Sequence, residues 1–179
     1  GNLDQMEIVP VIFIVPDFFR SPSQAHRILV KGITNRIAEF RTQFPTSFVK
    51  EVQIDCDWTA GTRVDYFSFL ENLSKNLPKG FGEVSVTIRL HQITDAQRQG
   101  VPPVKKGMLM VYNLSSVKEI PNRSSILDIR ILRSYLARSK AYPIELGCIF
   151  PLFSWGLHYN TDGKFMGFVR DVNGFPWNN

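Results

Sequence analysis

The strongest constraint on the fold is a strict alternation of apolar and polar residues in two strand-like runs, residues 52–58 and 84–91. Because successive side chains of a strand point to opposite faces, each run has one apolar and one polar face. A parallel sheet with helices on both sides needs two apolar faces, so the alternation disfavours a doubly wound fold. It fits a (β/α) barrel, with helices outside and polar groups in the interior. The polar faces carry Gln53, Asp55 and Asp57 in the first run, and Ser85, Thr87, Arg89 and His91 in the second.

The order of the predicted elements agrees with a barrel. Strands are expected at residues 8–15, 49–58, 83–91, 107–113 and 143–153, and the first of these is apolar enough to be buried on both faces. Capping signals at residues 21–24, 62–65 and 125–128 predict that a helix begins at each. This order predicts a parallel sheet with right-handed crossovers. Residues 92–106 are expected to form a polar loop, and residues 155–170 a β-hairpin.

The length of the chain limits how much of a barrel it can form. A full barrel has eight strands and about 250 residues, whereas this chain has 179 residues and five predicted barrel strands. We therefore expect an α/β fold, an incomplete or truncated (β/α) TIM-like barrel followed by a C-terminal hairpin. Residues 1–179 would form one domain that lacks the N-terminal strands of the full barrel. An open sheet leaves an unpaired strand edge, so a homodimer would be one way to cover it.

Composition and charge exclude several classes. Hydrophobic residues make up 44% and charged residues 21%, which is unlike a disordered chain. The net charge is +5, but the basic residues are scattered and form no nucleic-acid motif, so no nucleic-acid partner is expected. Cys56 and Cys148 lie in apolar runs and are expected to be two buried free thiols. No phosphate loop, dinucleotide fingerprint or metal-ligand spacing is present, so neither a cofactor nor a metal is expected.

Candidate functional residues gather at the ends of the predicted strands, where barrel proteins place their sites. Paired carboxylates suit glycoside hydrolysis, since one acts as acid and the other as nucleophile or base. Aromatic rings beside polar groups commonly hold sugars. The catalytic candidates are Asp57, Asp55 and Asp17; the substrate-binding candidates are Trp58, Arg89, His91, Gln92, Tyr112, Asn113 and Trp155.

Each of these candidates also has a structural interpretation. The carboxylate of Asp55 or Asp57 would pair with Arg89 on the next strand as a purely structural ion pair. His91 would be a hydrogen-bonded structural histidine, and Asn113 would only shape a turn. Trp58 and Trp155 would close the top of the core without touching a ligand.

The segment Ile54-Asp-Cys-Asp-Trp-Thr59 resembles the fourth-strand signature of chitinase-type glycoside hydrolases, which ends Asp-x-Asp-x-Glu. The resemblance covers Asp55 and Asp57. It departs at Thr59, where those enzymes have their catalytic glutamate. The resemblance implies a barrel that acts on carbohydrate, and it provides no catalytic acid in this chain.

A second resemblance covers most of the chain. Val52-Gln-Ile-Asp-Cys-Asp-Trp-Thr59, Thr87-Ile-Arg-Leu-His-Gln92, Val101-Pro-Pro-Val104, Met108-Leu-Met-Val-Tyr-Asn113, Ser125-Ile-Leu-Asp128 and Pro151-Leu-Phe-Ser-Trp155 are similar to an uncharacterised family of Bacteroides-type barrel proteins. Those proteins are secreted or lipid-anchored. The resemblance implies an extracytoplasmic location, a lipid anchor outside this chain and further strands before Ile8. It assigns no catalytic residue.

Two functional hypotheses follow. The first is an extracytoplasmic, carbohydrate-active protein that resembles a glycoside hydrolase. In it Asp57 serves as acid/base or ligand carboxylate, and Asp55 and Arg89 set its charge and orientation. The alternative is a non-catalytic glycan-binding or assembly module, which the threonine at position 59 favours.

Overall fold

The computed structural model describes residues 7–43, 49–118, 124–138 and 141–170. Their contacts group into two compact units. The first comprises the described residues within 1–109 and 139–147, and the second those within 110–138 and 148–179. Among the described helices, none is long and apolar enough to cross a bilayer.

The principal sheet confirms the predicted fold class. Its strands are β1 (Val11–Phe13), β2 (Glu51–Asp55), β3 (Glu83–Arg89), β4 (Lys106–Met110) and β5 (Glu145–Ile149), in that spatial order. β1 pairs with β2, and β2 with β3, in parallel. Within the described residues the order is linear, so the sheet is open and not a closed barrel.

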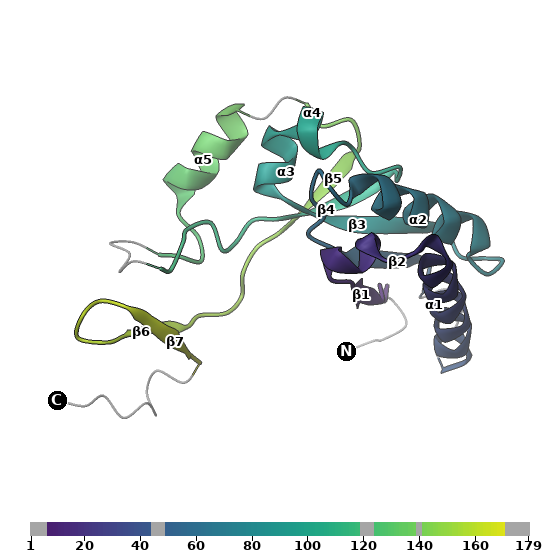
Figure 1. Ribbon diagram of the computed structural model, residues 1–179, viewed down its shortest axis with the longest axis horizontal. Coiled ribbons are helices and arrows are strands. Elements are labelled where there is room, and N and C mark those ends of the chain that lie inside the picture. Colours follow the sequence, from purple (N-terminus) through teal and green to yellow (C-terminus); the bar gives the residue numbers. More distant parts are fainter. Residues whose placement is uncertain (1–6, 44–48, 119–123, 139–140, 171–179) are drawn as a thin grey trace. The chain divides into compact units, whose positions relative to one another are not determined.

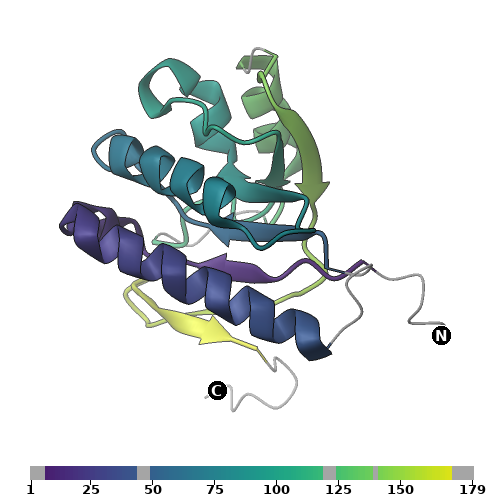
Figure 2. The ribbon, with the colours of Figure 1, turned by 90° about the vertical axis from the view of Figure 1, so that its right-hand side faces the viewer.

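The helices of the first unit lie where a barrel would place them. A 3-10 turn, η2 (Pro16–Arg20), follows β1; α1 (Ser23–Gln43) leads to β2, and α2 (Arg63–Asn76) leads to β3. α1 and α2 run side by side across one face of the sheet (Figure 2). The short helices α3 (Leu90–Thr94) and α4 (Ala96–Gln99) come after β3 (Figure 1).

The apolar core lies between that helical layer and the sheet. Alternate residues of β2 and β3, among them Ile54, Val86 and Ile88, are fully buried. On the helical side Leu70 and Leu73 of α2 are also fully buried. Burying side chains of this size contributes about 1.5–3 kcal/mol each. The alternation in the sequence is thus explained, because one strand face meets the helices and the other does not.

The outer strands correct two expectations. β1 is not buried on both faces, because Val11 and Phe13 are 57% and 66% exposed. β1 lies at an edge of the open sheet, where only β2 pairs with it. Cys56 is a buried free thiol, as expected, but Cys148 in the edge strand β5 is exposed. An apolar run therefore does not establish burial when its strand lies at an edge.

Several element ends also differ from the expectations. β3 ends at Arg89, so His91 lies in helix α3 and not on the strand. The expected polar loop over residues 92–106 contains the end of α3 and all of α4. The first helix begins at Ser23, and the capping box expected from Thr62 to Asp65 does not form, because Thr62 makes no side-chain capping bond.

The second unit contains helix α5 (Ile129–Arg138) and a hairpin, β6 (Gly156–Tyr159) with β7 (Phe165–Val169), whose strands pair antiparallel. The hairpin confirms the prediction. α5 begins later than the sequence signal at Ser125, because the carboxylate of Asp128 accepts the backbone N–H of Arg130 at 2.8 Å. The predicted end of this helix, near residue 140, lies outside the described residues.

Candidate functional site

Polar side chains of β2 and of the segment directly after it face those of β3 in three successive pairs, on the face of the sheet opposite the helices. Register pairs Gln53 with Ser85, and Gln53 Nε2 donates to Ser85 Oγ at 3.3 Å. One step further along the strands, Thr87 Oγ1 donates to Asp55 Oδ1 at 2.6 Å. The structure thus confirms that the polar positions share a face. It also gives Asp55 a hydroxyl partner, the side chain of Thr87.

The third pair lies at the carboxyl ends of the strands. Arg89 Nε donates to Asp57 Oδ1 at 2.6 Å, and Arg89 Nη2 donates to Asp57 Oδ2 at 3.1 Å. Both carboxylate oxygens therefore accept from one guanidinium, the geometry that gives the strongest charge-assisted pairs. The Asp57 and Arg89 side chains are 46% and 27% exposed, whereas Gln53 and Ser85 are buried. The polar face becomes accessible at its carboxyl end, so a ligand can reach this ion pair.

Two buried residues hold those strand ends together. Gln92 Nε2 donates to the carbonyl oxygen of Trp58 at 3.1 Å, and Gln92 Oε1 accepts the N–H of Arg89 at 2.8 Å. Gln92 therefore bridges the segment after β2 and the last residue of β3. The Trp58 ring is 1% exposed, stacks on Tyr66 and donates from Nε1 to the carbonyl of Gln99. The hydrogen-bonding groups of Gln92 and Trp58 are therefore used inside the protein, where they hold in place the strand ends that carry the ion pair.

The position that would carry a chitinase-type acid is used for a turn. The backbone N–H of Thr59 donates to Thr62 Oγ1 at 3.0 Å, and the two hydroxyl oxygens lie 3.3 Å apart. These contacts join the segment after β2 to the start of α2. Thr59 has no ionisable group, so this position cannot transfer a proton to a leaving group.

Between the two aspartates lies Cys56, which faces the core. Burial raises the pKa of this thiol to about 12, and the nearby charges of Asp57 and Asp55 act in the same direction. The thiolate is the nucleophilic form of cysteine. Cys56 is therefore a packing residue and not a nucleophile.

His91 and Asp17 lie outside the strands that carry the three polar pairs. His91 is exposed on α3, because the chain turns into a helix immediately after Arg89. Asp17 lies in η2, where its exposed carboxylate accepts from Arg20 Nε at 3.1 Å. Neither side chain has a contact with Asp57 among the described interactions.

The remaining candidates belong to the second unit. Tyr112 packs edge-on against Phe153, whose ring lies 5.1 Å from that of Trp155. Trp155 in turn lies 4.6 Å from Phe168 of the hairpin. Asn113 has a φ of 56° and donates its N–H to the carbonyl of Ile126 at 2.7 Å, so it shapes a turn.

A buried charge network at the amino ends of the strands was not predicted. Glu51 accepts from Ser85 Oγ at 2.5 Å and from Lys106 Nζ at 2.7 Å. Glu51 lies two residues before Gln53, so continuing the alternation of polar residues by one step would have added Glu51 to the predicted polar face. Lys106 comes from β4, and no local pattern links it to Glu51. Among the described residues no group of three metal-ligating side chains occurs.

Comparison with solved structures finds a similar fold in several proteins. The Bacillus cereus spore cortex-lytic enzyme SleL matches with a TM-score of 0.59 and 17% identity over 92% of this chain. A putative sporulation-specific glycosylase, ydhD of Bacillus subtilis, gives 0.62 and 15% over 91%. The C-terminal domain of a putative chitinase from Desulfitobacterium hafniense gives 0.61 and 15% over 90%.

These likenesses show the fold and cover only part of each neighbour. The chain spans 40% of SleL, 58% of ydhD and 51% of the chitinase domain. No protein-family profile matches the sequence, and no curated protein does. The chain thus shares the α/β architecture of about half of each of these structures.

Proposed function

We propose that this chain binds carbohydrate at the carboxyl ends of β2 and β3, through Asp57 and Arg89, without cleaving it. The observation that carries the proposal is the half-exposed, doubly hydrogen-bonded pair of these two residues on a fold shared with glycosylases. A carboxylate next to a guanidinium offers acceptors and donors to sugar hydroxyl groups. Only part of their hydrogen-bonding capacity is used by the pair itself.

Binding is favoured over hydrolysis by the arrangement of the carboxylates. A retaining or inverting glycosidase needs one carboxyl group that gives a proton to the leaving oxygen. Here both oxygens of Asp57 accept hydrogen bonds from Arg89, Asp55 accepts from Thr87, and position 59 is a threonine. Each carboxylate is therefore placed as an acceptor.

An extracytoplasmic location is part of the same proposal. It is supported by the neighbours described as a spore cortex-lytic enzyme and a sporulation-specific glycosylase. The lipid anchor and the homodimer that the sequence suggests remain proposals too. The exposed Val11 and Phe13 on edge strand β1 support self-association, because an uncovered apolar edge favours a partner.

The test is calorimetric titration of the protein with oligomers of N-acetylglucosamine, the sugar of chitin. We expect saturable binding that falls about tenfold or more in Asp57→Asn, because a charge-assisted hydrogen bond contributes roughly 1.5–3 kcal/mol. Glu39→Gln is the matched control, since Glu39 is also a carboxylate paired with an arginine but lies exposed on α1. No binding by folded protein, or equal binding by Asp57→Asn, would refute the proposal. Release of shorter oligomers would identify the protein as a hydrolase instead.

A further inference from the structure

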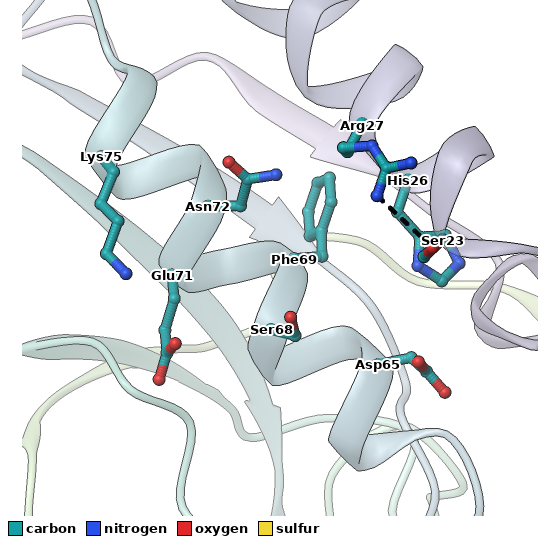
Figure 3. A pocket seen from close by; sticks show the side chains of 9 residues that line it. All are labelled: Ser23, His26, Arg27, Asp65, Ser68, Phe69, Glu71, Asn72 and Lys75. Carbon is teal, nitrogen blue, oxygen red and sulfur yellow. Dashed lines mark hydrogen bonds between the residues drawn. The ribbon is translucent and has the colours of Figure 1, made fainter.

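A cavity lies on the helical side of the first unit, between α1 and α2. Its volume is about 260 Å³ and it is lined by side chains of these two helices (Figure 3). Pockets for drug-sized ligands have about 300–1,000 Å³, so this one suits a smaller molecule. All nine lining residues lie within 23–75, so the cavity belongs to one unit and involves none of the residues of the strand-end site.

The lining residues recur at helical spacing and carry both signs of charge. On α2, Asp65, Ser68 and Asn72 follow an i, i+3, i+7 pattern and share a face; on α1, Ser23 and Arg27 are one turn apart. Figure 3 shows Arg27 on the side of Asn72 and Asp65 at the other end of that row. The described contacts give Asp65 no ion-pair partner, and Arg27 only a 3.5 Å hydrogen bond to Ser23 Oγ. Asp65 thus offers an acceptor for a cation and Arg27 a donor for an anion, and Glu71 and Lys75 add one charge of each sign to the lining.

A buried histidine marks the cavity as incomplete. His26 lines it and is only 7% exposed, and its Nε2 atom has no hydrogen-bond partner among the described residues. Its ring packs against Phe18 and Phe19, which cannot satisfy that nitrogen. A buried polar atom without a partner costs about 1–3 kcal/mol. A polar ligand in the cavity would supply the missing partner.

We propose that this cavity binds a small zwitterion, an amino acid or short peptide, with its ammonium group at Asp65 and its carboxylate at Arg27. His26 would complete its hydrogen bonding with the bound molecule. The span from amine to carboxylate in an extended dipeptide is roughly 7 Å, since each residue extends about 3.3–3.6 Å. The rise along α2 between Asp65 and Asn72 is about 10 Å, so an extended dipeptide is short enough to lie along this row of residues. This proposal does not depend on carbohydrate binding at Asp57 and Arg89.

The test uses glycylglycine and two analogues that each lack one of its charges. N-acetylglycylglycine lacks the ammonium group, and glycylglycinamide lacks the carboxylate. Binding is measured by calorimetry and by the NMR shift of the His26 imidazole. We expect glycylglycine to bind about tenfold more tightly than either analogue, because each lacks one charge-assisted contact. In Asp65→Asn the advantage over the acetylated probe disappears, and in Arg27→Gln the advantage over the amide disappears.

Arg36→Gln is the control, because Arg36 is an exposed arginine of α1 that pairs with Glu39 and does not line the cavity. It should leave all three affinities unchanged. Equal affinity for the three probes, or no binding of glycylglycine up to about 10 mM, would overturn the proposal. The proposal would also be overturned if Arg36→Gln reduced the preference for glycylglycine over glycylglycinamide as much as Arg27→Gln does. Because the variants are on surface helices, circular dichroism confirms that each is folded before it is titrated.

Discussion

Replacing Gln92 with methionine removes the bridge between the ends of β2 and β3. Methionine has a similar length and volume, so packing is largely kept while both hydrogen bonds are lost. The 3.1 Å bond to the carbonyl of Trp58 and the 2.8 Å bond from the N–H of Arg89 both lie in part-buried or fully buried surroundings. Each backbone group left without a partner costs about 1–3 kcal/mol of stability. Part of this cost is offset because methionine, unlike Gln92, brings no polar amide into the buried site. We expect the free energy of unfolding to fall by about 2–4 kcal/mol.

The measurement is urea unfolding of the variant beside Gln97→Met. Gln97 lies exposed on the neighbouring helix α4, so the same substitution there should change stability by less than about 0.5 kcal/mol. Native-state hydrogen exchange adds a local readout, because the amide of Arg89 should exchange faster in Gln92→Met. If Gln92→Met is no less stable than Gln97→Met, and the Arg89 amide stays protected, then Gln92 does not hold the strand ends together.

Three further predictions concern the rest of the first unit. Native protein should resist iodoacetamide at Cys56 at pH 8, because burial raises its pKa to about 12, and mass spectrometry should find that site labelled only after unfolding. Gly107→Ala should lower the free energy of unfolding by about 1–3 kcal/mol, because the new Cβ would lie 2.5 Å from an isoleucine methyl. In Gly32→Ala of α1 the new Cβ meets nothing within 4 Å, so this variant should be more stable by about 0.5–1 kcal/mol. Thermal unfolding compares the two variants. The hydrogen bond to Glu51 raises the pKa of Lys106 above 10.5, so Glu51→Gln should lower the free energy of unfolding at pH 7. The difference in this free energy between variant and wild type should shrink as pH rises above 10.5. Urea unfolding across pH would contradict this if the difference stayed constant.

The element types were largely predictable because each depends on local periodicity. The alternation around Asp55 and Thr87 predicted which side chains share a face, and the pattern of residues 155–170 predicted the hairpin. The ends of elements were less predictable. His91 continues the strand alternation in the sequence, yet the chain enters helix α3 at Leu90, where the Gln92 side chain caps the helix by accepting the N–H of Arg89.

The candidate site was only partly predictable. Asp57 and Arg89 were placed on facing strand ends by counting alternate positions, and the structure brings them together. Trp58 and Gln92 were expected to touch substrate, but both are buried and bonded inside the protein. Burial of a particular side chain depends on which distant elements cover it, and here Trp58 meets Tyr66 of α2 and Gln99 of α4.

The sequence by itself determined the class of fold, the parallel order of the strands and the polar face, since these follow from periods of two and 3.6 residues along the chain. Only the tertiary structure decided that Arg89 pairs with Asp57, that Lys106 reaches Glu51, and that α1 and α2 line a cavity beside His26. The physical reason is that register and helix packing join residues about 30 to 55 positions apart, and such contacts are set by the geometry of the whole sheet and its covering helices.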